Sequence, residues 1–273
     1  MSVPAPFGGR HPLVSLRLLV LTLGIDLATQ NSATAACRIR WDSGRALVEM
    51  IPAGPKGEDN GWLTTAMAST LDVDGWVGID APFGWPANMV DAVHRYAAGE
   101  PWSAPDKQLF RYRLTDRTLQ GLEFGIRPFS VSADKIAMTT WRCASLIQQS
   151  RPGAQFVRRS GEDRLVEVYP GAALKVWGFV ERDKYKGPAK KAQRELLVRE
   201  LESRATGWLE WIGEGRVAAV ASDHALDAVL SALVARAAAT GRTSWPEPPQ
   251  ADLAALEGWI HLPDAGCFAE LAK

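Results

Sequence analysis

Aspartates at the ends of apolar segments are the residues of this chain best suited to chemistry. The triplet Gly-Ile-Asp occurs at 24–26 and again at 78–80, and each copy closes an apolar run. A carboxylate buried without a partner is strongly unfavourable, so Asp26 and Asp80 need donors, a cation or the rim of a sheet. On adjacent parallel strands, which lie about 4.8 Å apart, the two carboxylates would emerge at one edge, and this spacing suits a two-metal site. The alternative is that each aspartate caps a turn.

Two further acids lie in a segment that we expect to be a buried helix. Residues 222–235 are apolar nearly all round and begin with a serine suited to an N-cap. Asp223 in the first turn suits the helix dipole, whereas Asp227 follows one turn later on the same face among apolar neighbours. A divalent cation shared with the two strand-end aspartates would offset their repulsion. Oxygen ligands indicate Mg²⁺ or Mn²⁺ rather than zinc.

For two other polar residues the sequence is compatible with more than one role. Glu167 lies inside the β-like run 165–169, where it could join the acidic site or face solvent on an edge strand. His224 could assist proton transfer, although a polar residue in the first turn of a helix needs no such role.

Two segments concentrate positive charge in a chain of zero net charge. The 31 basic and 31 acidic residues exclude a generally basic nucleic-acid binder, so any nucleic acid must be held by local patches. The candidates for phosphate contacts are Arg111, Arg113, Arg117, Lys184, Lys186, Lys190 and Lys191. A solvated helix face is the alternative for both segments.

The pattern of apolar runs predicts a mixed α/β sheet. Runs at 17–28, 33–41 and 45–51 have short connections, which predict an antiparallel meander. A helix over 62–71 has the length to return the chain parallel to the first strand as a fourth strand, 76–80. Further elements are expected as a strand at 165–169, helices at 87–98, 133–149 and 193–204, and another helical piece beginning at 207–211.

Composition indicates a soluble globular protein. With 273 residues, 47% of them hydrophobic and 23% charged, the chain can form a full core. We expect an extension at 1–12 and one domain at 13–273, with an insertion at about 87–160. The three cysteines lack metal-ligand spacing, and no segment reaches the ~20 apolar residues of a membrane helix. Reduced thiols and a cytoplasmic location are expected, with no membrane partner.

The order of motifs resembles a known family. Both Gly-Ile-Asp triplets, Arg-Leu-Thr-Asp-Arg, Val-Glu-Val-Tyr-Pro-Gly, Ser-Asp-His-Ala-Leu-Asp-Ala and Glu-Gly-Trp-Ile-His-Leu-Pro together resemble the family called domain of unknown function 429, over about residues 18–263. The resemblance implies a ribonuclease H-like sheet of five strands in the order 3-2-1-4-5, flanked by helices. It also implies that Asp26, Asp80, Asp223 and Asp227 bind metal, much as in Holliday-junction resolvases, while Glu167 on the fifth strand is less secure.

The resemblance further implies a nuclease that hydrolyses phosphodiester bonds of DNA or RNA with two Mg²⁺ or Mn²⁺ ions. Asp26 would bridge both ions, Asp80 and Asp227 would hold one each, and Asp223 and Glu167 would complete the site. One alternative is a phosphotransferase of the actin and sugar-kinase type, which also follows Gly-Ile-Asp with a Thr/Ser-rich turn, here 29–34. The other is a catalytically inert nucleic-acid-binding module of the same fold.

Overall fold

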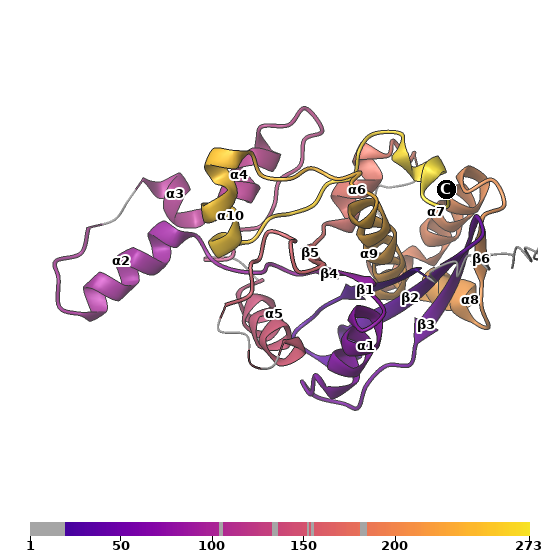
Figure 1. Ribbon diagram of the computed structural model, residues 1–273, viewed down its shortest axis with the longest axis horizontal. Helices are drawn as coiled ribbons and strands as arrows, with labels where there is room; N and C mark the ends of the chain where they lie inside the picture. Colours follow the sequence, from indigo (N-terminus) through magenta and orange to yellow (C-terminus); the bar gives the residue numbers. More distant parts are fainter. Residues whose placement is uncertain (1–19, 104–105, 133–135, 152, 154–155, 181–184) are drawn as a thin grey trace, which may run out of the picture.

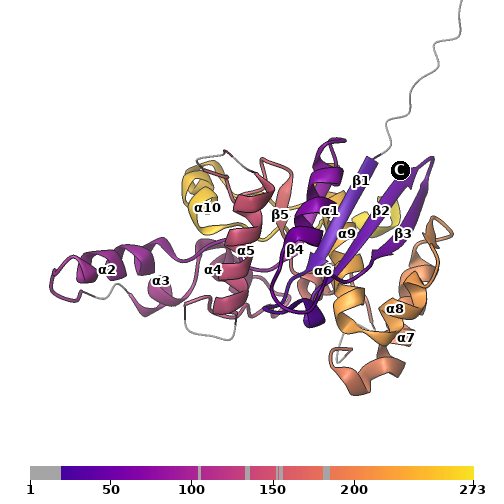
Figure 2. The same cartoon turned by 90° about the horizontal axis from the view of Figure 1, so that it is seen from below.

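A mixed sheet with helices on both faces forms the centre of the protein (Figures 1 and 2). The computed structural model describes residues 20–103, 106–132, 136–151, 153, 156–180 and 185–273. The predicted extension at 1–12 lies outside these residues. The described sheet has six strands in the order β5-β4-β1-β2-β3-β6.

The antiparallel part of the sheet is the predicted meander. It consists of β1 (Val20–Asp26), β2 (Ala35–Asp42) and β3 (Arg45–Ile51), each antiparallel to the next. The β2–β3 turn places Ser43 and Gly44 at φ of 50° and 80°. Positive φ at both central residues gives a two-residue turn whose twist matches that of the flanking strands. The short connections therefore determine the pairing of these three strands.

The parallel part of the sheet brings the two Gly-Ile-Asp triplets side by side. Helix α1 (Gly61–Leu71) leads into β4 (Trp76–Asp80), which pairs parallel with β1 so that Asp26 lies opposite Asp80. Strand β5 (Leu165–Glu167) then pairs parallel with β4. The predicted order of these five strands, 3-2-1-4-5, is confirmed.

The sixth strand corrects the expected five-stranded sheet. We predicted a helical piece from 207–211, but Leu209–Trp211 forms β6 and pairs parallel with β3. Three residues are too few to show the two-residue alternation of a strand. The open edge of β3 offers unpaired backbone groups, and pairing with it decides the conformation of this short segment.

Helix α9 (Asp223–Ala239) lies directly on the sheet. Ser222 is its N-cap and accepts a hydrogen bond from the backbone N–H of Ala225, as predicted. The helix packs against β1, β2 and β4, and glycines on two strands allow its close approach. A methyl group at Gly24 would lie 2.0 Å from the carbonyl oxygen of Ala228, and one at Gly78 would lie 2.5 Å from that of Ser231. The glycine of each triplet thus admits the helix that carries Asp227.

Two hydrophobic cores cover the two faces of the sheet. On one face α9 packs with α6 (Pro170–Val176), α7 (Lys191–Arg204) and α8 (Gly215–Ala221). On the other face lie α1 and α5 (Ala137–Ser150) (Figure 2). The strand ends carrying Asp26 and Asp80 therefore emerge between two layers of helices.

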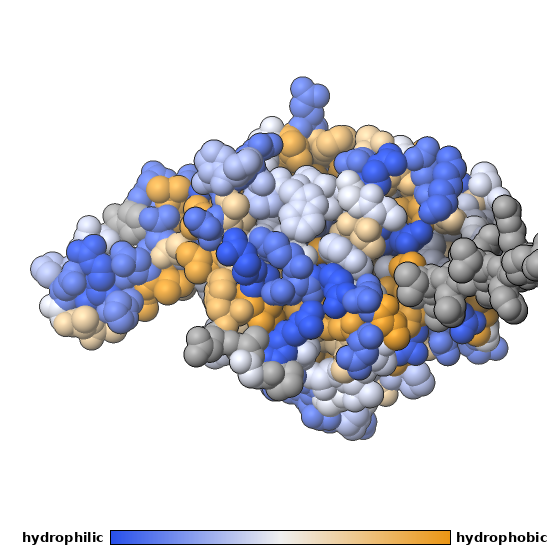
Figure 3. All heavy atoms as spheres, in the orientation of Figure 1, coloured by the Kyte–Doolittle hydropathy of each residue, from blue (hydrophilic) through white to orange (hydrophobic). Residues whose placement is uncertain are grey.

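A helical projection extends from the sheet beyond β4 (Figure 1). It contains α2 (Ala87–Ala97) and α3 (Lys107–Arg111), followed by α4 (Leu114–Gln120), which packs against α10 (Ala251–Glu257). Exposed apolar side chains such as Val90 and Val93 lie on this projection, and hydrophobic residues are visible on its surface in Figure 3. The predicted helices at 87–98 and 133–149 correspond to α2 and α5, with 133–135 outside the described residues.

No single helix in the described part of the chain is long and apolar enough to cross a membrane. Helices α8 and α9 reach that length and composition only together, across a bend of 119°.

Candidate metal centre

Three of the predicted acids converge at one edge of the sheet. Carboxylate oxygens of Asp26, Asp80 and Asp227 all lie within 4.8 Å of one another. Asp26 and Asp80 end adjacent parallel strands in register. Asp227 reaches the same place from the second turn of α9 because the helix lies close to the two strands. Such a set of hard oxygen ligands fits Mg²⁺ or Mn²⁺.

The charge of this cluster is only partly compensated. Burial raises the pKa of Asp80 well above its ordinary value, and repulsion from Asp26 and Asp227 raises it further. Among the described residues no group donates a hydrogen bond to the Asp80 carboxylate. Burial also raises the pKa of Asp227, to about 6, although the ammonium of Lys186 opposes the rise. A cation between these carboxylates would remove the repulsion that perturbs them.

Asp227 is held by two consecutive residues that the sequence did not indicate as its partners. The hydroxyl of Tyr185 donates to Oδ1 at 2.6 Å, and Nζ of Lys186 lies 2.7 Å from Oδ2. Burial and the adjacent Asp227 carboxylate raise the pKa of Tyr185 well above its ordinary value, so the phenol stays protonated and donates. Burial lowers the pKa of Lys186, but the three acids outweigh this effect and raise it above its ordinary value.

The two residues that open α9 act on different partners. Asp223 was predicted as a metal ligand with Asp227, but its Oδ2 accepts a hydrogen bond from the backbone N–H of Gly187 at 2.7 Å. Asp223 is not part of the three-acid cluster. Nδ1 of His224 lies 2.7 Å from Oδ2 of Asp26, and this hydrogen bond raises the pKa of His224. His224 thus orients the carboxylate at the end of β1.

Glu167 and Arg113 form a buried ion pair, which revises the predicted roles of both. The guanidinium of Arg113 binds the two carboxylate oxygens of Glu167 at 2.7 Å each, and the backbone N–H of Phe83 donates to Oε2 at 2.9 Å. Arg113 also pairs with Asp116 and is only 1% exposed. Because breaking such a pair leaves an uncompensated buried charge, we assign Glu167 and Arg113 to the support of the site. Glu167, which we predicted as a catalytic residue completing the site, and Arg113, which we predicted as a phosphate contact, instead pair with each other.

The other predicted phosphate contacts that the structure describes lie apart from the three clustered aspartates. Arg111 stacks its guanidinium over the ring of Tyr112 at 5.2 Å, and Arg117 donates to the Tyr112 carbonyl at 2.9 Å. Lys190 is half-buried and Lys191 exposed at the start of α7. In both ribbon views α6 lies between α4 and α7, so these are two separate patches (Figures 1 and 2). The predicted Lys184 lies outside the described residues.

A cavity of about 490 Å³ opens beside the acids. Its wall includes Asp26 and Asp80, and its size is that of a small-molecule site. It combines apolar and aromatic side chains with cations, among them Phe129, Tyr169, Arg127, Lys175 and Lys186. Phe129 is 61% exposed and was not singled out from the sequence, because a lone aromatic in an irregular segment carries no periodic signal.

The loop after β1 is fixed from the α5 side. The guanidinium of Arg142 donates to the carbonyl of Ala28 at 2.7 Å, to Thr34 Oγ1 at 3.0 Å and to Asn60 Oδ1 at 3.0 Å. It also donates to Asn31 Oδ1. These contacts close the 28–34 turn on itself and hold the end of β1, where Asp26 lies.

Comparison with known proteins identifies the family. No curated protein and no solved structure matches the chain. The family model described as Protein of unknown function (DUF429) matches residues 24–251, a range that contains both Gly-Ile-Asp triplets and α9. Because this match covers most of the 273 residues, the chain belongs to the DUF429 family.

Proposed function

We propose that this protein is a metal-dependent nuclease that hydrolyses phosphodiester bonds at the cluster of Asp26, Asp80 and Asp227. The observation that carries the proposal is the convergence of three carboxylates within 4.8 Å, two of them with pKa values raised by burial and mutual repulsion. Bound Mg²⁺ or Mn²⁺ would supply an activated water and stabilise charge on the phosphodiester.

The residues of the chain divide the work of holding such a centre. Asp26 and Asp80 present oxygens from strand ends, and Asp227 presents its carboxylate from the facing helix. His224 orients Asp26, while Tyr185 orients Asp227 through a 2.6 Å hydrogen bond. Carboxylates that are already oriented by hydrogen bonds from neighbouring side chains lose little conformational entropy when they bind an ion.

We also propose a ribonuclease H-like fold. Its support is the antiparallel meander beside two parallel strands, with the acidic helix packed on the sheet. The extra strand β6 lies at the edge farthest from β5 and leaves the acidic edge unchanged.

A nucleic acid is the substrate that the surroundings of the acids favour. The adjoining cavity of about 490 Å³ lies within the range of sites that enclose a small ligand. Phe129 offers a ring on which a base could stack, and Arg127 and Lys175 on the same wall carry charge for phosphate. These features suit one nucleotide unit placed beside the metal centre.

The kinase alternative has less support. That interpretation requires the turn at 29–34 to present hydroxyls and backbone groups to a phosphate. Instead Thr34 is 5% exposed, and its hydroxyl contacts the backbone of Ala28 and Gln30 as well as Arg142. Asn31, which is 2% exposed, is bonded to Arg142 and to the carbonyl of Pro55.

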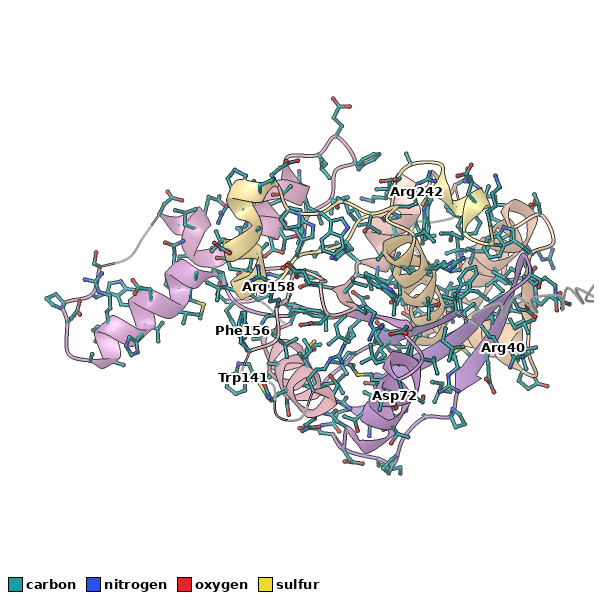
Figure 4. The ribbon with its side chains drawn as sticks, viewed as in Figure 1. Arg40, Asp72, Trp141, Phe156, Arg158 and Arg242 are labelled. Atoms are coloured by element: carbon teal, nitrogen blue, oxygen red, sulfur yellow. The ribbon has the colours of Figure 1, made fainter. Side chains whose placement is uncertain are left out.

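Cleavage of labelled single-stranded and duplex oligonucleotides with Mg²⁺ tests the proposal. The protein should cut at least one of these substrates, and Asp26→Asn should bind it in Ca²⁺ yet leave it intact in Mg²⁺. Asp72→Asn is the matched control, because Asp72 is exposed at the end of α1 (Figure 4). A melting temperature raised by ATP, without affinity for oligonucleotides, would favour the kinase. Binding without cleavage in any metal would favour the inert module.

A further inference from the structure

Lys186 places a positive charge inside the acidic cluster. Its Nζ lies 2.7 Å from Asp227 Oδ2, and it also interacts electrostatically with Asp80 and Asp26. The side chain is 53% exposed and lines the cavity beside the acids. The ammonium therefore faces both the carboxylates and the space that a substrate would enter.

Side-chain hydrogen bonds fix the backbone of the residues before and after Lys186. Arg194 is 1% exposed, and its Nη1 donates to the carbonyls of Tyr185 at 3.0 Å and Gly187 at 2.7 Å. The N–H of Gly187 is bound by Asp223, and the hydroxyl of Tyr185 by Asp227. A lysine whose side chain is simply solvated does not require its neighbouring backbone to be held by buried hydrogen bonds. The segment positions the Lys186 side chain over the acids.

Charge balance limits how many metal ions fit beside this ammonium. Three ionised carboxylates and one ammonium leave two negative charges, or one when His224 is protonated, and in either state a single divalent ion is enough to neutralise them. A second divalent ion would leave the part-buried centre with an excess of positive charge, which is costly away from water.

We propose that Lys186 takes the place of a second metal ion, so that the centre binds one divalent ion and the Lys186 ammonium stabilises negative charge on the reacting phosphodiester. This inference rests on the proposed nuclease function and replaces the two-metal arrangement expected from the sequence. In the hydrolysis a water oxygen bonds to phosphorus and gives up a proton to solvent. The bridging P–O bond breaks, and the leaving oxygen takes a proton from solvent. Lys186 contributes charge throughout and keeps its proton.

The simpler role for Lys186 is that of an inert counter-ion to a buried aspartate. Both roles predict that removal of the ammonium changes stability, so stability cannot separate them. They differ in the number of ions bound. Only a lysine that occupies an ion's place should, when removed, admit a second ion.

Equilibrium dialysis of the full chain against Mn²⁺ measures that number. The natural protein should bind one Mn²⁺ per chain, and Lys186→Met should bind two. Lys186→Arg keeps the charge and should bind one. Lys175→Met is the matched control and should also bind one, because Lys175 lines the same cavity but, among the described residues, its Nζ donates only to the Gly125 carbonyl, at 3.4 Å.

The outcomes separate this inference from the proposed function. Two Mn²⁺ ions on the natural protein would overturn the role of Lys186 and leave the metal centre standing, and this result does not depend on whether any variant folds. One Mn²⁺ of unchanged affinity on a folded Lys186→Met would overturn it as well. No Mn²⁺ on the natural protein would overturn the metal centre and the inference together.

Discussion

Asp80 is the acid of the cluster with the least support from its surroundings. Asp26 is bonded to His224, and Asp227 is bonded to Tyr185 and Lys186. Asp80 has no such partner in the described part of the chain, and burial raises its pKa. A side chain kept in an unfavourable place is typical of a residue retained for function at a cost in stability.

Replacing Asp80 by Asn should therefore separate stability from metal binding. Without metal at pH 7, Asp80→Asn should leave the free energy of unfolding unchanged or raise it by about 1 kcal/mol, because it removes repulsion from Asp26 and Asp227. Its Mn²⁺ affinity should fall at least tenfold. Urea denaturation in EDTA and Mn²⁺ calorimetry measure the two effects, with Asp72→Asn as control. A loss of stability above about 2 kcal/mol would show that Asp80 is a structural acceptor.

The sequence indicated an acid correctly where its role depends on neighbouring residues, and incorrectly where it depends on a distant partner. Asp26 and Asp80 were found because they end apolar runs, and Asp227 because it interrupts an apolar helix. Glu167 gives the same signal as Asp80, yet Arg113, distant in the chain, neutralises it. The partner of a buried acid depends on tertiary packing, which a local pattern does not contain. For the same reason Lys186 was placed among phosphate contacts rather than beside Asp227.

At the scale of elements, the contact of α9 with β1 and β4 assembles the cluster. The helix can approach because Gly24 and Gly78 have no side chain on that face. The glycine of each Gly-Ile-Asp triplet is thus as important for the geometry as the aspartate. The sequence showed the repeat, but only the packed helix explains its first residue.

A methyl group at Gly24 should push α9 away from the strands. Because it would lie 2.0 Å from the Ala228 carbonyl oxygen, Gly24→Ala should lower the free energy of unfolding by about 3 kcal/mol or more and weaken Mn²⁺ binding. Gly121→Ala is the control, because φ there is −77° and the added methyl has ordinary contacts. Thermal unfolding and Mn²⁺ calorimetry give the readouts. Full stability and unchanged affinity in Gly24→Ala would contradict this account of the helix.

The start of α7 is the basic element whose role in substrate binding can be tested most directly. The affinity for nucleic acid falls as salt rises, and each neutralised phosphate makes the slope of log affinity against log salt concentration more negative by about 0.7–0.9. The double variant Lys190→Glu and Lys191→Glu should flatten that slope and weaken binding to all oligonucleotide sequences alike, as fluorescence anisotropy in Ca²⁺ would measure. Arg40→Glu should leave the slope unchanged, because exposed Arg40 pairs with Leu21 near the start of β1, away from the acids (Figure 4). An equal effect of both variants would remove α7 from the binding surface.

At the scale of the whole molecule, β6 shows the limit of prediction for the fold. Apolar runs and connection lengths predicted five strands and the antiparallel pairing of the first three, while the order 3-2-1-4-5 was implied by the resemblance to the family. The three-residue β6 lies between turns and forms only because β3 offers a free edge. Its existence depends on a partner far away in the chain, so no window of sequence could show it.

Acid should destabilise the protein through His261. This residue is fully buried, its Nε2–H donates to the Ser160 carbonyl, and Thr243 contacts its Nδ1. Burial lowers the pKa of His261 from 6.5 to about 4, against the opposing effects of the hydrogen bond to the Ser160 carbonyl and of the Glu162 carboxylate. Between these values the unfolded chain takes up a proton at this residue and the folded chain does not. His261 should therefore lower the free energy of unfolding by about 3 kcal/mol as the pH falls from 6.5 to 4.

Urea denaturation at pH 7 and pH 4.5 measures this contribution. The difference between the two pH values should shrink in His261→Gln, which has no group to titrate there. It should persist in His94→Gln, because His94 is exposed on α2. Equal differences in the natural protein and His261→Gln would assign the acid sensitivity to other groups.

Diffraction from a crystal soaked in Mn²⁺, recorded for its anomalous signal, would show directly whether the three aspartates bind a metal ion. We expect an anomalous peak with oxygens of Asp26, Asp80 and Asp227 at about 2.0–2.6 Å from it, the distances of oxygen ligands to such ions. The same crystal of Asp80→Asn should show a weaker peak or none. Absence of a peak between the three aspartates of the natural protein, at Mn²⁺ concentrations that label other sites, would contradict the metal centre and the nuclease proposed from it.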